Sequence, residues 1–155
     1  MSRHHFTRDS SPLVFGHGCA AILVDRAGRY LLQRRDDIPR IWFPGHWGFF
    51  GGTVEPGETA LDATAREVAE EINLVLPVGR FTFFMQMDVR LDALPGIRER
   101  HFFTALVEEP ELPALRLGEG AEMRWVSGEE ALGTLTLSPY DGFGLFLHHA
   151  RARVR

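Results

Sequence analysis

Apolar and polar positions along this chain follow two periods, one typical of strands and one typical of helices. The first apolar run ends at a turn around Gly28, and a second run returns after it as the other half of a hairpin. Strands are expected at 17–25, 30–35, 47–50, 80–91, 100–108 and 122–126. Helices are expected between and after these strands, so the pattern predicts an α/β domain in which helices flank a mixed β-sheet.

The clearest helix is expected at residues 59–72. Thr59 can cap its N-terminus, with Asp62 three residues on as the partner in a capping box. Asn73 follows the helix and tolerates the left-handed conformation of a C-terminal cap. The apolar positions fall at i, i+4, i+7 and i+11, which predicts one buried stripe made by Leu61, Ala65, Val68 and Ile72.

Two shorter helices are expected near the C-terminus, one opening at residues 127–130 and one starting at Ser138 and Pro139. The buried side of the last helix is expected to carry Phe143, Phe146 and Leu147. No linker or repeat divides the sequence. We therefore expect a flexible N-terminal arm at residues 1–12 and a single domain at residues 13–155.

Composition and charge narrow the classes of function. The 155 residues are 45% hydrophobic and 25% charged, with a formal net charge of -4, which is ordinary for a globular domain. The apolar runs are far shorter than the roughly 20 residues of a membrane-spanning helix. The N-terminus also lacks the apolar segment of a secretory signal, so a cytoplasmic location without a membrane partner is expected. The acidic balance argues against nucleic acid as a partner.

Three glutamates, Glu67, Glu70 and Glu71, cluster on the helix face opposite the apolar stripe. Carboxylates this close repel one another, and a cation among them would relieve the repulsion. Oxygen ligands favour Mg²⁺, with Mn²⁺ as the alternative. A solvated charged face would show the same pattern, so the helix alone leaves both interpretations open.

The spacing around this helix is more specific. It runs from Gly52 through five residues to Glu58, and through seven more to REVAEEINL at residues 66–74. This resembles the Nudix box, and the flanking strands are similar to those of the Nudix α/β/α sandwich. One position departs from the family pattern, since Asn73 stands where the family has Gly. Asn also tolerates a positive φ, so this departure is mild.

The resemblance implies a role for each matching position. The metal ligands would be Gly51, through its backbone carbonyl, and Glu67, Glu70 and Glu71. Glu70 is also a candidate for the catalytic base, and Glu58 and Arg66 would orient the cluster as further catalytic residues. Mg²⁺ would bridge phosphate oxygens and lower the pKa of a bound water, whose proton a nearby carboxylate can accept.

A second candidate base lies near the C-terminus. The segment EGAEMRW at residues 119–125 resembles the acidic loop before a Trp in many Nudix hydrolases. Glu119 would then reach the metal site as the general base, with Glu122 as its rival. A solvated loop is the alternative.

Three residues are candidates for substrate binding: Arg34, Arg35 and Phe50. The two arginines end a strand, and alternation puts them on opposite faces, so at most one is expected to reach a substrate phosphate. Phe50 precedes the box and would stack on a nucleobase, with core packing as the alternative.

The resemblance thus implies Mg²⁺-dependent hydrolysis of a phosphoanhydride bond in a nucleoside diphosphate linked to another moiety. The substrate would be a small nucleotide, either a nucleoside triphosphate or a nucleotide sugar. A non-catalytic, ligand-sensing Nudix domain is the main alternative, although the complete set of glutamates argues against it. Isoprenoid diphosphate isomerisation and RNA cap removal have less support. The sequence is compatible with a homodimer and does not identify the substrate.

Overall fold

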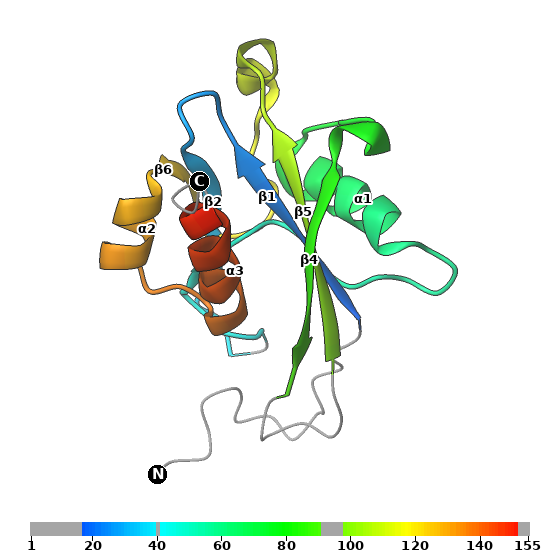
Figure 1. The fold of residues 1–155 in the computed structure, drawn as a ribbon, viewed down its shortest axis with the longest axis horizontal. Coiled ribbons are helices and arrows are strands. Elements are labelled where there is room, and N and C mark those ends of the chain that lie inside the picture. Colours follow the sequence, from blue (N-terminus) through cyan, green and yellow to red (C-terminus); the bar gives the residue numbers. More distant parts are fainter. Residues whose placement is uncertain (1–16, 40, 91–97, 152–155) are drawn as a thin grey trace.

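The computed structural model describes residues 17–39, 41–90 and 98–151. They form a mixed six-stranded sheet of order β3-β2-β1-β5-β4, with β6 paired to β2 and helices on both faces (Figure 1). This confirms the predicted α/β/α sandwich. The strands are β1 (Gly18–Val24), β2 (Tyr30–Arg34), β3 (Trp47–Gly48), β4 (Thr82–Val89), β5 (Arg98–Leu106) and β6 (Glu122–Val126). The helices are α1 (Ala60–Ile72), α2 (Gly128–Thr134) and α3 (Pro139–Ala150), with 3₁₀ turns η1 (Val78–Arg80) and η2 (Glu109–Ala114).

The central strand β1 is buried on both faces. It pairs with β2 in antiparallel and with β5 in parallel orientation. Helices cover both faces of the sheet at this central strand (Figure 1). Its alternating side chains therefore enter two different cores. Leu23 packs with Val68 of α1 in one core, whereas Ile22 packs with Leu145 of α3 in the other. The long apolar run at the start of the sequence follows from this double burial.

Helix α1 begins and ends as its sequence predicts. The side chain of Thr59 accepts a hydrogen bond of 3.1 Å from the backbone N–H of Asp62, and its hydroxyl donates to the Asp62 carboxylate at 2.6 Å. Asn73 closes the helix with a left-handed φ of 57°. Val68 and Ile72 are fully buried, so the predicted apolar stripe faces the core.

Helix α3 buries a different face from the one predicted. Phe143 and Phe146 are 49% and 53% exposed, so their assignment to the buried side is wrong. The side that faces the sheet instead carries Tyr140, Asp141, Gly144, Leu145 and His148. Gly144 is needed there because a Cβ would lie 2.9 Å from the Phe102 ring. Asp141 and His148 have partners inside the protein, and these partners offset the cost of burying polar groups.

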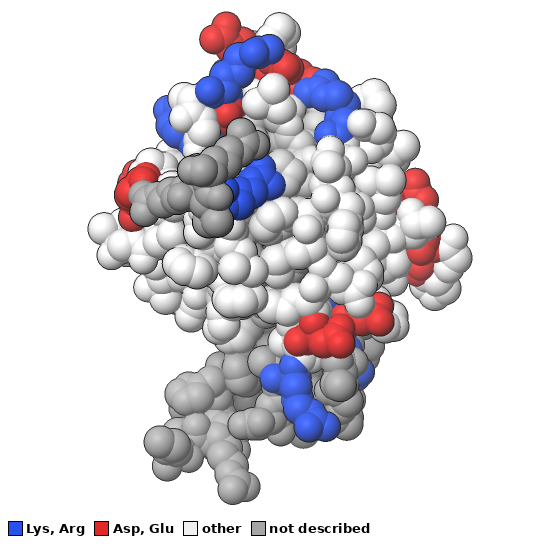
Figure 2. Space-filling view, in the orientation of Figure 1, with Lys and Arg blue, Asp and Glu red and all other residues white. Residues whose placement is uncertain are grey.

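Figure 2 shows the face that carries α3 and β4, and its centre is largely free of acidic and basic side chains. Three strand predictions also change by two residues at one or both ends. The strand predicted at 100–108 covers Arg98–Leu106. The strand predicted at 47–50 ends at Gly48, and the one predicted at 80–91 is preceded by η1 and covers Thr82–Val89.

Some sequence predictions fall outside the described residues. The predicted arm at residues 1–12 is one of them, and residue 91, the last of the strand predicted at 80–91, is another. Within the described ranges, no helix combines the length and the apolar character that crossing a membrane requires.

Candidate functional site

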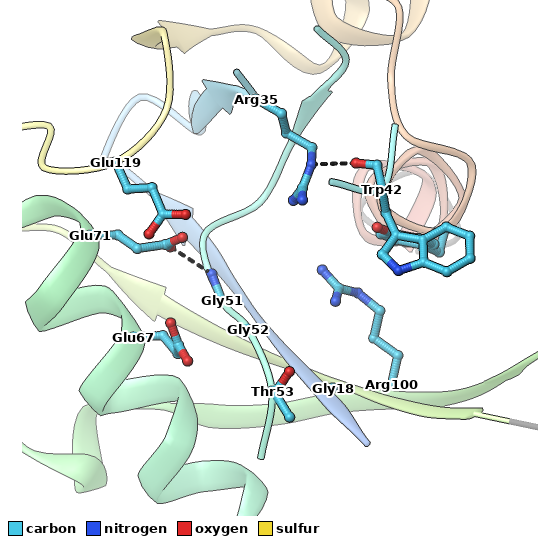
Figure 3. Close-up of a pocket in the computed structure, with 11 residues that line it drawn as sticks. Gly18, Arg35, Trp42, Gly51, Gly52, Thr53, Glu67, Glu71, Arg100 and Glu119 are labelled. Atoms are coloured by element: carbon cyan, nitrogen blue, oxygen red, sulfur yellow. Dashed lines mark hydrogen bonds between the residues drawn. The ribbon is translucent and has the colours of Figure 1, made fainter. Parts of the chain in front are cut away.

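A cavity of about 220 Å³ opens between α1, the segment after β3 and the start of β5 (Figure 3). One wall is acidic and carries Glu67, Glu71 and Glu119. The facing wall is cationic and aromatic. Its side chains are Arg35, Trp42, Arg100 and Tyr140, and the remaining lining residues are Gly18, Gly51, Gly52 and Thr53.

The backbone at residues 50–52 attaches the cavity to the sheet. The carbonyls of Phe50 and Gly52 accept hydrogen bonds of 2.8 and 2.9 Å from the N–H groups of Ala21 and Cys19 in β1. Between them, Gly51 has a φ of 140°, and a Cβ there would collide with the backbone of β1. Within the described residues, β1 donates no hydrogen bond to the Gly51 carbonyl. This oxygen is therefore available for a ligand.

Glu71 is the most buried carboxylate of the site, with 7% of its surface exposed. Its Oε2 accepts a hydrogen bond of 2.9 Å from the Gly51 N–H, and its Oε1 accepts one of 3.3 Å from the Gln33 amide. Burial raises the pKa of Glu71 to about 7, with a further increase from the nearby charges of Glu67 and Glu119. Such a group is costly to keep ionised unless a cation joins it.

Glu67 lies one turn before Glu71 and against the chain at Gly52. A Cβ at position 52 would lie 2.5 Å from Oε1 of Glu67, so any larger residue there would displace this carboxylate. Burial raises the pKa of Glu67, although its ion pair with Arg66 opposes the change. The α1 carboxylates that line the cavity are therefore Glu67 and Glu71, two of the three that the resemblance implied as metal ligands.

Arg66 binds Glu58, the other residue predicted to orient the cluster, and also binds Glu67. Its guanidinium donates hydrogen bonds of 2.9 and 3.0 Å to Glu58 and of 2.8 Å to Glu67. It also reaches the Thr53 carbonyl at 3.1 Å and Glu70 at 3.2 Å. Hydrogen bonds from Arg66 hold the pKa of Glu58 below its usual value. This fork ties the start of the box to the middle of α1.

Glu70 points away from the cavity. Its side chain is 61% exposed and contacts Arg66, and it does not line the cavity. The three glutamates of the helix are therefore divided between two environments, two at the cavity and one at the surface.

Glu119 reaches the cavity from a loop that docks on the end of α1. The Arg116 and Gly118 N–H groups donate to the carbonyls of Ile72 and Glu71 at 3.0 and 2.7 Å. The Ala121 N–H donates to the Arg34 carbonyl at 2.9 Å, which ties the far end of the loop to β2. These bonds satisfy carbonyls at the C-terminus of the helix and hold Glu119 beside Glu71 on the acidic wall.

One of the three candidate substrate-binding residues reaches the cavity. The two arginines point in different directions, as alternation predicts. Arg35 points into the cavity, and its Nε donates a hydrogen bond of 2.7 Å to the Trp42 carbonyl. Arg34 points away and lies 3.5 Å from Glu122 at the surface. Phe50 does not reach the cavity, because its side chain is fully buried in the core against α1. The structure thus contradicts base stacking by Phe50 and agrees with the packing alternative.

Sequence reasoning missed four side chains of the site. Gln33 holds Glu71, and Trp42, Arg100 and Tyr140 line the cavity. The buried ion pair between Arg100 and Asp141 joins β5 to α3 at 2.9 Å. No local signal marked Arg100, because its strand also contains Arg98, Glu99 and His101.

Comparisons with known proteins agree with this geometry. A family model described as NUDIX domain matches residues 15–142. The nucleoside triphosphatase NudI of Escherichia fergusonii is 37% identical over 87 residues, which cover 55% of this chain and 61% of that protein. The chain thus spans less than two thirds of the length of that relative. An uncharacterized Nudix hydrolase of Pseudomonas aeruginosa is 32% identical over 132 residues, covering 82% of this chain and 72% of that protein.

The fold is also similar to that of solved structures. The crystal structure of a MutT protein from Methanosarcina mazei Go1 has a TM-score of 0.71 and 28% identity, and the likeness covers 89% of this chain and 94% of that one. The matching box, the matching family model and the shared sandwich lead to one conclusion: the chain belongs to the Nudix hydrolase family.

Proposed function

We propose that the protein hydrolyses a phosphoanhydride bond in a nucleoside diphosphate derivative, with Mg²⁺ bound by the carboxylates of the cavity. The observation that carries this proposal is the convergence of Glu67, Glu71 and Glu119 on one cavity that Arg35 enters from the other side. A diphosphate has to be neutralised before a nucleophile approaches phosphorus. Carboxylates that bind a cation and an arginine that binds phosphate together provide this neutralisation.

The chemistry of the donor set fits a hard divalent cation. Glu67 and Glu71 supply carboxylates, and the Gly51 carbonyl beside them is not bound to β1. No three acidic, histidine or cysteine side chains in the described ranges are already arranged to hold one ion, so Glu119 would have to turn toward α1 to complete a set. Mg²⁺ prefers such oxygen donors, and Mn²⁺ accepts them. When bound, the ion would neutralise phosphate oxygens and acidify a water molecule.

We favour Glu119 over Glu70 as the base that takes the proton of this water. Glu119 lines the cavity, whereas Glu70 is exposed and bound to Arg66. In this proposal Glu70 supports catalysis through Arg66, which in turn holds Glu67. A direct ligand role for Glu70 would require it to leave Arg66.

The relatives and the size of the cavity guide the choice of substrate. Because the relative from Escherichia fergusonii is named a nucleoside triphosphatase, we propose a nucleoside triphosphate, with a nucleotide sugar as the alternative. The cavity of about 220 Å³ is smaller than the roughly 300–1,000 Å³ of pockets that enclose a whole drug-sized ligand. This supports a site that holds the phosphates and leaves the nucleoside nearer the opening.

Release of phosphate or pyrophosphate tests the proposal. The wild-type protein with Mg²⁺ is offered nucleoside triphosphates, nucleotide sugars and dinucleoside polyphosphates, beside Glu67→Gln and the control Glu111→Gln. Glu111 is paired with Arg80 outside the cavity, so only Glu67→Gln should lose turnover. Nucleotide binding by the wild-type protein without turnover of any compound would instead support the ligand-sensing alternative.

A further inference from the structure

Two arginine side chains converge on the cavity from different elements. Arg35 follows the end of β2, and Arg100 belongs to β5. Figure 3 shows both guanidinium groups pointing into the same space, across from Glu67, Glu71 and Glu119. Like charges that converge in a half-enclosed site repel each other, and an anion between them would remove this repulsion.

Arg100 is held by one edge only. Its Nε and Nη2 donate to Oδ1 of Asp141 at 3.2 and 2.9 Å, and its guanidinium lies 4.5 Å from the centre of the Tyr140 ring. Asp141 is itself fixed, because its Oδ2 accepts from the Ser138 hydroxyl and the Phe49 N–H. Nη1 makes no hydrogen bond to another described residue. The remaining edge of the guanidinium therefore keeps its donors for a ligand.

Gly18 keeps this edge accessible. A Cβ on Gly18 would lie 3.3 Å from Nη1 of Arg100 and 3.6 Å from the Gly52 carbonyl, and Gly18 itself lines the cavity. The cavity thus continues past Gly18 to the Arg100 side chain, although only 7% of Arg100 is exposed.

We propose that Arg100 is a substrate-binding residue that, together with Arg35, binds a phosphate group of the substrate on the wall opposite Glu67 and Glu71. The inference rests on the proposed function only in taking the ligand to be a phosphoanhydride. A purely structural Arg100 would account for the ion pair with Asp141. It would not account for the convergence with Arg35 or for an edge left toward the cavity.

This second binding position has a consequence for the substrate class. One phosphate lies toward the carboxylates and their cation, and another lies on the guanidinium pair. Two linked phosphates would contact both walls, as the proposed function requires, whereas a monophosphate would contact only one. Paired guanidinium groups suit this task because each presents a planar fork of donors to phosphate oxygens.

The test measures binding of inorganic pyrophosphate by calorimetry, at low ionic strength and with EDTA present so that no divalent cation contributes. The variant is the double substitution Arg100→Gln with Asp141→Asn, which removes both charges and leaves no unpaired buried carboxylate. The control is Arg80→Gln, which removes an arginine paired with Glu111 outside the cavity. Circular dichroism confirms that each variant is folded.

The double variant is expected to bind pyrophosphate about tenfold more weakly than wild type, because it loses charge-assisted hydrogen bonds, whereas Arg80→Gln binds normally. Equal affinities in the double variant and wild type, or no binding by wild type, would overturn the inference. Failure of the proposed function looks different. Wild type would then bind pyrophosphate in an Arg100-dependent way and yet hydrolyse no nucleotide with Mg²⁺.

Discussion

Gly52 and Glu67 are in contact at the junction between the segment after β3 and helix α1. The space beside the α-carbon of Gly52 is filled by the Glu67 carboxylate, only 2.5 Å from where a Cβ would lie. The first glycine of the box and Glu67, which we propose as a metal ligand, thus form one packed unit. The spacing between them in the sequence reflects this contact as well as the conformation of the backbone.

Gly52→Ala should therefore act on the Glu67 carboxylate. The added methyl group displaces this carboxylate, and we expect kcat to fall about 10–100-fold, the range found when a group that orients a metal ligand is lost. The matched control is Gly79→Ala, because Gly79 has no atom within 4 Å of an added Cβ. Steady-state hydrolysis with Mg²⁺ measures the effect. Equal rates for the two variants would show that the contact has no functional role.

Arg66→Lys tests the guanidinium fork that joins Glu58 to Glu67. A lysine keeps the charge but cannot bind Glu58 through two parallel hydrogen bonds, so kcat should fall about tenfold or more. Arg80 is a matched control because it binds Glu111 through two nitrogens and the Leu106 carbonyl through one. Arg80→Lys should lower the melting temperature without changing kcat. A similar loss of activity in both variants would contradict the orienting role of Arg66.

Glu119→Gln and Glu70→Gln distinguish the two candidate bases. Because Glu119 lines the cavity and Glu70 is exposed, we expect the larger loss of kcat from Glu119→Gln, about 100-fold or more for a general base. Glu70→Gln should cost less, since it weakens only one bond of Arg66. The kcat values of the two variants at saturating Mg²⁺ decide the question. The reverse order would assign the catalytic role to Glu70.

The parts of the site that follow local rules could be predicted from the sequence. The caps of α1 depend on Thr59 and Asn73 themselves, and their positions in the sequence were sufficient to bound the helix. Alternation at the end of β2 was sufficient to separate Arg34 from Arg35, the residue that follows the strand. In each case the interaction lies within a few residues along the chain, where periodicity carries the information.

The remaining contacts depend on topology. Gln33 meets Glu71 across 38 positions, and Arg100 meets Asp141 across 41. Nothing in the local sequence indicates either contact. The error on α3 has a related cause. Size and apolarity selected Phe146, whereas packing against the sheet required a small residue at Gly144.

Glu71→Gln should stabilise the metal-free protein. Burial raises the pKa of Glu71 to about 7. At about pH 8 the ionised carboxylate is therefore buried in the folded state, which is unfavourable, whereas water solvates it in the unfolded state. We expect a gain of about 1–3 kcal/mol in unfolding free energy with EDTA present, and no increase in melting temperature on adding Mg²⁺. Glu111→Gln should have the opposite sign, because Arg80 lowers the pKa of Glu111. Destabilisation by both substitutions would contradict this account of Glu71.

His148 should make the stability of the fold depend on pH in the mildly acidic range. Its ring is buried between α3 and the sheet, with Nδ1 at 2.9 Å from the Tyr30 hydroxyl and the ring 5.1 Å from that of Phe84. Burial lowers the pKa of His148 to about 4, and the charges of Arg151 and His149 act in the same direction. The unfolded state therefore binds a proton near pH 6.5, the ordinary pKa of histidine, while the folded state does not.

The stabilisation from neutral His148 is fully present above about pH 6.5 and is lost as the pH falls toward 4. Urea unfolding of wild type and His148→Gln, both with EDTA, isolates this group, because all other titrations are shared. Between about pH 7 and pH 4.5, wild type should lose about 1–3 kcal/mol relative to the variant. Parallel pH profiles would mean that His148 titrates normally in the folded protein, and that its burial beside Tyr30 does not exclude the charged form.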